Sequence, residues 1–418
     1  MSQITVALAG CGSRGHDTYA QCQHRFPDRM KIVAAADIDP VKLERMRTEF
    51  DLPAERCFTS AEEMLKQPKL ADVMFICTPD ACHYAQAMAA LALDYHLLLE
   101  KPAARTAEEC RDIERLSLER HRHVVVCHVL RYTAFFQKLK ELIENGTVGD
   151  VMSIQHLEKV QYWHDAHSYV RGIWRRLDET NPMILAKSCH DIDILLWLAD
   201  RHCERVSSFG SLRHFRRENA PEGAPARCTD GCPAAATCPY NAETFYMDRV
   251  RNGQLGWPVN VLNPYPTEEN IREALEQGPY GRCVYHCDND VVDHQTVNME
   301  LEGGITVDFN MSAFTANGGR NIRVMGTIGE LVGDMDANTI QVLRFGQPAE
   351  VIDVRTLTTD FSGHGGGDVR MVEDLLDLVA GKRGLTGALT NISDSVESHL
   401  VCFAAEESRL HGGQVVEM

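Results

Sequence analysis

The feature that most constrains the fold is a glycine-rich turn near the start of the chain. An apolar run over residues 4–9 ends at the turn Gly10-Cys11-Gly12-Ser13-Arg14-Gly15, and we expect a helix from about residue 16 to residue 26. The pattern G-x-G-x-x-G between a strand and a helix is typical of a dinucleotide-binding unit. The first glycine permits a tight turn, the second lets a pyrophosphate approach the backbone, and the third lets the helix pack on the strand. We therefore predict an N-terminal Rossmann domain whose cofactor contacts include Gly10, Gly12, Ser13, Arg14 and Gly15.

A carboxylate at the end of the second expected strand indicates which dinucleotide binds. The run Lys31-Ile32-Val33-Ala34-Ala35-Ala36 ends at Asp37, about 20 residues beyond the glycine motif. A carboxylate at this point accepts hydrogen bonds from both ribose hydroxyls of NAD and repels the 2′-phosphate of NADP, which favours NAD. The nearby Arg14 would soften that preference. The alternative is that Asp37 is only a turn residue at a strand end.

Three more apolar runs continue the alternation of strands and helices, at residues 71–77, 96–99 and 123–127. Strands separated by helical segments predict a doubly wound parallel sheet, whose ligands bind at the carboxyl ends of the strands. Lys101 and His128 fall at such ends, which makes them candidates for chemistry rather than packing. Further cofactor contacts expected at or near these ends are Thr78, Pro79, His83, Glu100, Lys101 and His128.

Length and charge limit the remaining possibilities. A chain of 418 residues exceeds the roughly 250–300 residues that one hydrophobic core supports, so we expect two domains. A formal net charge of −18 disfavours nucleic acid and anionic membranes as partners. No signal-like segment precedes the first strand, and no apolar run reaches the ~20 residues needed to span a bilayer. We expect a cytoplasmic protein with a small-molecule substrate.

Taken together, the glycine motif, Asp37-Ile38-Asp39-Pro40 and Glu100-Lys101-Pro102 resemble the Gfo/Idh/MocA superfamily of sugar and polyol oxidoreductases. Downstream, residues 187–195, 304–309 and 326–330 resemble its catalytic-histidine helix and C-terminal sheet. The resemblance implies a Rossmann domain over residues 1–130. It further implies an α+β domain over residues 131–418, with a large open, mostly antiparallel sheet that pairs copies into a dimer or tetramer. An insertion at about residues 212–288 has no counterpart in it.

Carried over residue by residue, the resemblance assigns the catalytic groups. Lys101 matches the lysine that contacts the nicotinamide ribose and the reacting hydroxyl, and His190 matches the histidine near the carbon that loses hydride. The family often has an aspartate four residues before this histidine, but here Ala186 stands there and Lys187 lies three before His190. Residues three apart are neighbours on a helix, so Lys187 is a third catalytic candidate. Which of the three is the base stays open.

A dense group of aromatic and ionisable residues at 162–175 favours sugar binding, because aromatic faces and planar polar groups suit vicinal hydroxyls. The alternatives are a surface helix without function, or a metal site at His164 and His167 that lacks an evident third ligand. Near the C-terminus, His364 precedes three glycines, which indicate either a close ligand or a hinge. The expected substrate contacts are Arg131, His164, His167, Arg171, Trp174 and His364.

Five of the fifteen cysteines fall within the insertion, which shows no strong helix or strand period. A long segment with little core of its own needs a cross-link to stabilise its fold, and a structural zinc ion would supply one. The preferred ligands are Cys228, Cys232, Cys238 and Cys287, although their spacing matches no common zinc finger. Cysteine-only ligation of an iron–sulfur cluster is a less favoured alternative, and free thiols or redox disulfides are others.

The leading functional hypothesis is an enzyme that transfers hydride reversibly between NAD and a secondary hydroxyl of a sugar, glycoside or cyclitol. The same lysine, histidine and cofactor would also serve a redox-neutral glycosidase or epimerase that holds NAD tightly. A third hypothesis is a non-catalytic NAD or sugar sensor, in which Ala186 marks lost chemistry; the presence of both Lys101 and His190 argues against it.

Overall fold

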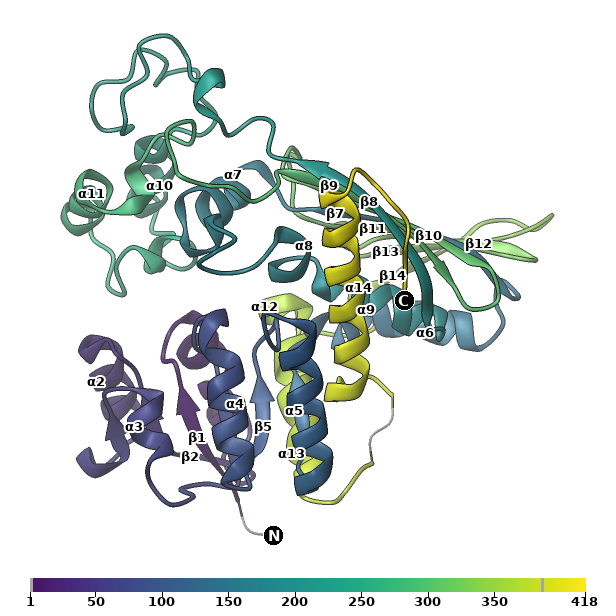
Figure 1. The fold of residues 1–418 in the computed structure, drawn as a ribbon, viewed down its shortest axis with the longest axis horizontal. Coiled ribbons are helices and arrows are strands. Elements are labelled where there is room, and N and C mark those ends of the chain that lie inside the picture. The colour runs from purple at the N-terminus through teal and green to yellow at the C-terminus, as the bar shows by residue number, and fades with distance from the viewer. Residues whose placement is uncertain (1–2, 385–386) are drawn as a thin grey trace.

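The computed structural model describes residues 3–384 and 387–418, and its N-terminal half is built on a six-stranded parallel sheet (Figure 1). The strand order 3-2-1-4-5-6 is that of a Rossmann fold. Across the sheet the strands are β3 (Cys57–Phe58), β2 (Met30–Ala36), β1 (Ile4–Ala9), β4 (Val73–Ile76), β5 (His96–Leu99) and β6 (Val124–Val126). The five strands predicted from apolar runs are confirmed as β1, β2, β4, β5 and β6. Strand β3 was not predicted.

Helices cover both faces of this sheet, which is why its strands are apolar on both sides. On one face, β1 and β2 pack with the helical turns η1 (Ser13–Ala20), with α1 (Cys22–Arg25) and with Met46 of α2 (Pro40–Glu49). The other face packs against α3 (Ala61–Leu65), α4 (His83–Ala92) and α5 (Ala107–Arg120). The helix after the glycine motif begins at Ser13 rather than at about residue 16.

The second sheet has nine strands and is antiparallel except for the β7–β10 pair. In order they are β14 (Glu350–Asp353), β13 (Thr339–Arg344), β12 (Gly329–Asp334), β11 (Gly319–Gly326), β7 (Val151–Lys159), β10 (Ile305–Ser312), β9 (His294–Leu301), β8 (Cys203–Ser211) and β15 (Val416–Glu417). Strict alternation along β10 buries Val307 and Phe309 and exposes Thr306 and Asp308. One face of the sheet therefore carries the core and the other is open, as predicted.

Three helices fill the buried face of the second sheet: α6 (Ala134–Glu144), α9 (Cys189–Ala199) and α14 (Ile392–Leu410). The C-terminal part of the chain also returns to the Rossmann half. Helix α13 (Gly367–Val379) inserts Met371 and Leu375 into the first core, and Val126 of β6 donates a backbone hydrogen bond to Thr390. The division at residue 130 thus separates the two sheets, but α13 packs with the first one.

The insertion after β8 contains two helices that its sequence pattern did not reveal, α10 (Ala242–Arg251) and α11 (Glu268–Gln277). Thr267 begins α11 with a capping box to Asn270, and Tyr246, Met247 and Ile271 form a small separate core. In Figure 1 these helices lie beside the short helices α7 (Tyr162–Asp165) and α8 (Met183–Ala186), above the Rossmann half. The remaining short helix, α12 (Ser362–Gly365), lies between the two halves.

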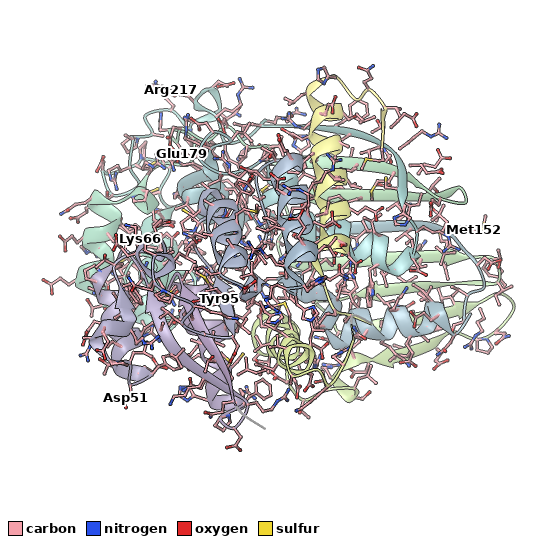
Figure 2. All side chains as sticks on the ribbon, turned by 60° about the horizontal axis from the view of Figure 1, so that its bottom comes forward. Asp51, Lys66, Tyr95, Met152, Glu179 and Arg217 are labelled. Carbon is pink, nitrogen blue, oxygen red and sulfur yellow. The ribbon has the colours of Figure 1, made fainter. Side chains whose placement is uncertain are left out.

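Most charged side chains are at least partly exposed, and most large apolar ones are buried. In Figure 2 Arg217 lies at the edge of the view; Tyr95 is 2% exposed, and its hydroxyl oxygen accepts a hydrogen bond from the Leu70 N–H at 2.7 Å. Within the described ranges, none of the helices combines the length and the apolar character needed to cross a membrane.

Candidate active site

The glycine motif joins β1 to η1, and its three glycines have different surroundings. Gly10 has φ +88°, and a Cβ there would lie 2.5 Å from the Cys77 carbonyl oxygen; a Cβ on Gly15 would lie 1.9 Å from the Gly10 carbonyl oxygen. A Cβ on Gly12 would meet no atom within 4 Å. The first and third glycines are therefore required by packing, while the second leaves open the space through which a dinucleotide pyrophosphate would approach.

Asp37 ends β2 beside this turn and is half-buried. Its carboxylate accepts hydrogen bonds from the backbone N–H groups of Cys11 at 2.6 Å and Asp39 at 2.8 Å. Two fixed donors hold the carboxylate in one orientation and leave each oxygen a further lone pair for a ribose hydroxyl. The residues present at this strand end therefore fit the adenosine half of NAD.

Arg14 is engaged in ion pairs within the protein. Its Nε lies 2.6 Å from Oε1 of Glu100, and its Nη2 lies 2.6 Å from Oδ1 of Asp368 at the start of α13. Burial alone would raise the pKa of Glu100, but Arg14 and then Lys101 outweigh it and hold that pKa below its ordinary value. The arginine thus braces the glycine turn against the residue that follows β5 and against α13.

Lys101 follows β5 and points across to the second domain. Its Nζ donates a hydrogen bond to the backbone carbonyl of Ala186 at 2.5 Å. Behind it, His83 bridges two loops, because its ring nitrogens lie 2.7 Å from the Pro102 carbonyl oxygen and 2.8 Å from that of Thr78. The predicted cofactor contacts Thr78 and His83 therefore shape the turn that presents Lys101.

A cluster of histidines lies next to Lys101. The ring of His128 is 5.7 Å from that of His190, and His364 is 6.2 Å from His190. Neither ring nitrogen of His128 nor Nδ1 of His190 has a hydrogen-bond partner among the residues that the structure describes. Burial, followed by the charge of Lys101, lowers the pKa of His190 well below its ordinary value. The imidazole is therefore neutral at physiological pH, and its buried Nδ1 is unpartnered.

Helix α9 and β7 add a buried charge network that sequence reasoning did not find. Glu158 of β7 lies 3.4 Å from Nζ of Lys187 and 2.8 Å from Arg320, which also pairs with Asp191 at 2.9 Å. Burial, with repulsion from Arg320 and Lys101, lowers the pKa of Lys187 although Glu158 opposes that shift. His156 completes the network at 2.7 Å from Asp191. Glu158, His156 and Arg320 come from strands that are distant in the sequence, so no local motif indicates that they meet. Asp191 is the exception, because it directly follows the predicted residue His190.

The predicted substrate contacts divide into two groups. His164 packs against Trp257, and burial followed by repulsion from Lys187 holds its pKa far below the ordinary value. The ring of His364 lies 6.2 Å from that of His190. Arg131 instead forms a buried two-pronged ion pair with Asp193, at 2.6 and 2.7 Å. That side chain joins two elements of the fold and is not open to a substrate.

The other three predicted contacts face the insertion or the Rossmann domain. His167 stacks on Tyr280 and lies 2.6 Å from the Tyr246 hydroxyl. Trp174 donates to Asp80 at 3.3 Å, beside the loop that closes β4. Arg171 donates to backbone carbonyls of Tyr240 and Arg282. All three side chains are thus engaged in contacts within the protein.

The expected zinc site is not supported. Among residues 3–384 and 387–418, no three histidine, cysteine or acidic side chains converge closely enough to hold one metal ion. Cys287, the predicted fourth ligand, directs its Sγ at the Cys283 carbonyl oxygen, 3.3 Å away, because both lie in one tight turn. All fifteen cysteines are free.

Residues 4–128 match the Gfo/Idh/MocA oxidoreductase family, NAD-binding Rossmann fold, and residues 140–418 match the C-terminal alpha/beta domain of the same family. The chain belongs to this family of NAD-binding oxidoreductases. It is 22% identical to YteT of Bacillus subtilis over 389 residues, which is 88% of each chain. It is 26% identical to inositol 2-dehydrogenase of Pseudomonas fluorescens over 196 residues, 47% of this chain and 54% of the other. A similar fold is seen in the WlbA dehydrogenase of Bordetella pertussis, solved with NADH and UDP-GlcNAcA, with TM-score 0.71, 18% identity and coverage of 100% and 98% of the two chains.

Proposed function

We propose that the protein is an NAD-dependent dehydrogenase that oxidises a secondary hydroxyl of a sugar, glycoside or cyclitol. The observation that carries the proposal is the position of Lys101 at the carboxyl end of the Rossmann sheet, where its ammonium donates a hydrogen bond to the carbonyl of Ala186, four residues before the buried His190. Ligands of open α/β sheets bind at that end.

The two groups divide the chemistry between them. Oxidation of an alcohol removes the hydroxyl proton and a hydride from the same carbon, and bound NAD supplies the hydride acceptor. His190 accepts the hydroxyl proton, since its imidazole is neutral and Nδ1 is unpartnered. The Lys101 ammonium stabilises the negative charge that develops on the substrate oxygen. Lys187 would supply a second amino group near these two residues. Its partner Glu158 is engaged in that ion pair, so this carboxylate is not free to bind the substrate hydroxyls.

Gly12 and Asp37 would hold the cofactor, the first by leaving room for the pyrophosphate and the second by accepting from the ribose hydroxyls. The choice of a carbohydrate or cyclitol is supported by the histidine-rich wall and by two similar proteins: one is an inositol dehydrogenase, and the other was solved with a nucleotide-linked sugar acid.

The test is to incubate the purified protein with NAD and a panel of sugars, glycosides and inositols, and to follow NADH and products together. NADH that rises with a keto product in equal amount is the expected result. Glycoside cleavage or epimerisation without net NADH would replace the dehydrogenase with a redox-neutral enzyme that uses the same residues. Binding of NAD with no turnover of any class of substrate would favour a sensor.

A further inference from the structure

A short antiparallel contact inside the insertion brings together cysteines that are far apart in the sequence. The backbone N–H of Cys228 donates to the Gly281 carbonyl at 2.9 Å, and that of Cys283 donates to the Ala226 carbonyl at 2.9 Å. Cys228 and Cys283 therefore lie on adjacent chain segments. Cys287 is one turn further on and outside this contact.

Four cysteines line one small pocket at this point: Cys228, Cys232, Cys238 and Cys283. A turn places two of them, because Ala235 N–H donates to the Cys232 carbonyl at 3.1 Å and Cys238 N–H donates to the Ala234 carbonyl at 2.9 Å. The rest of the wall of this pocket is mainly proline, alanine, valine and tyrosine. Four thiols thus surround an apolar space in a segment with little core.

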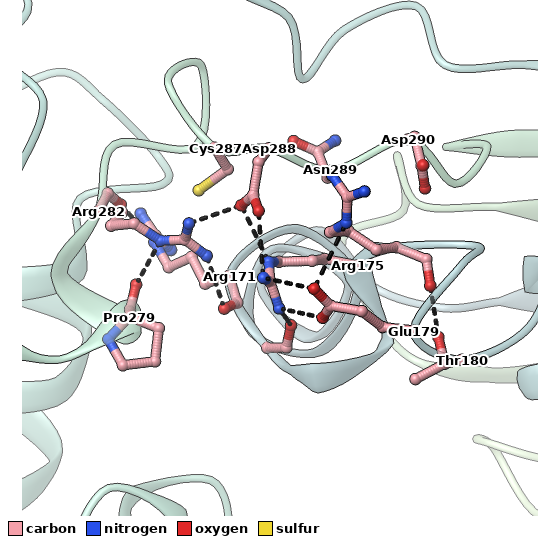
Figure 3. A network of polar contacts seen from close by, with 12 residues as sticks. Arg171, Arg175, Glu179, Thr180, Pro279, Arg282, Cys287, Asp288, Asn289 and Asp290 are labelled. Carbon is pink, nitrogen blue, oxygen red and sulfur yellow. Dashed lines mark hydrogen bonds and ion pairs between the residues drawn. The ribbon is translucent and has the colours of Figure 1, made fainter. Parts of the chain in front are cut away.

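Arg171 supplies a buried positive charge on the same pocket. Arg171 is 3% exposed, and its Nη2 lies 3.7 Å from Sγ of Cys228. No carboxylate in the described part of the chain pairs with it; its other acceptors are backbone carbonyls. Figure 3 shows the contrast with its neighbours, since Arg175 and Arg282 both pair with Asp288. A buried cation without an anion is costly, so this site calls for a negative group.

A single zinc ion does not fit this arrangement. Zinc holds sulfur atoms at about 2.3 Å, which brings the ligands together around one point. The cysteines here surround a space, and no three of them converge on one ion. A cluster of iron and sulfide is ligated by four cysteine thiolates that bind different iron atoms, so their sulfur atoms do not have to converge on one point. With these thiolates it carries net negative charge, and it accepts hydrogen bonds on its sulfurs. Arg171 is placed to donate one.

We propose that Cys228, Cys232, Cys238 and Cys283 bind an iron–sulfur cluster, with Arg171 as its counter-charge. The cluster has a structural role in this proposal, and no electron transfer is invoked. Arg171 is the last residue of η5 (Ala166–Arg171), which continues directly from the helix that carries His164. A cluster anchored at Arg171 would therefore fix the insertion to the wall of the active site.

The test uses the full chain, purified without oxygen and reconstituted with ferrous iron and sulfide. We expect about two or four iron atoms and as many sulfides per chain, with the broad visible absorption of a cluster. Cys238→Ser and Cys283→Ser should lose most of the iron, whereas Cys287→Ser and Cys203→Ser should retain it. Cys287 is the matched control, because it lies four residues from Cys283 and does not line the pocket.

Three results would overturn the proposal. Stoichiometric zinc with no sulfide would make the site a single-ion site. Wild-type protein that takes up neither metal, with its circular dichroism unchanged by the treatment, would leave the cysteines as free thiols. Retention of iron by both Cys238→Ser and Cys283→Ser would assign the iron to other residues. The wild-type measurement decides the question even if a serine variant fails to fold.

Discussion

The Lys101 ammonium donates a 2.5 Å hydrogen bond to the backbone carbonyl of Ala186, and so joins the end of β5 to the segment that leads into α9. Ala186 stands where the family resemblance places an aspartate. Here the backbone carbonyl oxygen of Ala186 orients the lysine. It does so without a negative charge, and this leaves the ammonium available to stabilise an anionic oxygen.

Replacement of Lys101 should therefore affect turnover far more than cofactor binding. In Lys101→Met we expect kcat to fall by about 10²–10⁴-fold, while the Kd for NAD changes by less than about threefold. Steady-state kinetics and NAD titration of the same preparation measure the two effects. Lys66→Met, at an exposed lysine, is the control. An unchanged kcat would remove Lys101 from the mechanism.

His190 gives a prediction about pH. Burial, then the charges of Lys101 and His128, lowers its pKa, so the imidazole is already deprotonated at and below neutral pH. A base is active above its pKa; lowering the pH from 8 to 6 should therefore not protonate His190. We expect kcat of His190→Gln to be about 10²-fold lower or more at every pH in that range. A deficit that vanishes at one end of the pH profile would contradict this assignment.

The second and third glycines of the motif, Gly12 and Gly15, should fail in different ways when changed to alanine. Gly12→Ala places its Cβ in open space, so the protein should fold normally but bind NAD at least tenfold more weakly. Gly15→Ala places its Cβ 1.9 Å from a carbonyl oxygen and should lower the melting temperature. Thermal melting and NAD titration of both variants separate the effects. Similar melting temperatures would show that the turn relaxes more easily than its geometry indicates.

Asp37 should determine the preference for NAD. In Asp37→Ala the ribose hydroxyls lose their acceptor and the repulsion of a 2′-phosphate disappears. We expect the Kd for NAD to rise about tenfold, equivalent to about 1.4 kcal/mol, and the preference over NADP to fall by at least that factor. Asp39→Ala is a matched control, since Asp39 caps α2 through Val41 N–H and should affect stability only. Unchanged discrimination would assign the preference elsewhere.

His399 makes stability depend on pH. Its Nδ1 lies 2.6 Å from the Ser395 carbonyl and its Nε2 accepts from Ala103 N–H at 2.9 Å, which defines a neutral tautomer. Burial and the neighbouring His128 lower its pKa from 6.5 to about 3. The unfolded chain therefore binds more protons between those values, and stability is lost as the pH falls below 6.5.

At pH 5 this single group should lower the free energy of unfolding by about 2 kcal/mol relative to pH 8. His399→Gln keeps a donor and an acceptor but does not titrate. Between pH 8 and pH 5 its free energy of unfolding, measured with denaturant, should therefore fall by about 2 kcal/mol less than that of the wild type. His411→Gln, at an exposed histidine, should behave as wild type. Parallel pH curves for wild type and His399→Gln would contradict the prediction.

Local patterns in the sequence were sufficient for the Rossmann half. The glycine motif, Asp37 and the apolar runs are contiguous signals, and the strands they predicted are present. The residues around the reacting groups were harder to predict because their partners are remote. Glu158 and Arg320 meet only through the pairing of β7 with β11, and Arg131 is committed to Asp193 by burial that spacing cannot reveal. Likewise, only the contact between residues 226–228 and 281–283 distinguishes Cys283 from Cys287.

Helix α14 packs against α5 of the Rossmann half and against α9 and β8 of the other half. One continuous helix is therefore shared by both cores, and it opposes rotation of one half away from the other about a hinge. Exchange of cofactor and substrate would then rely on movement of the insertion and nearby loops. For the same reason, heat should unfold the whole protein in a single cooperative step rather than one half at a time.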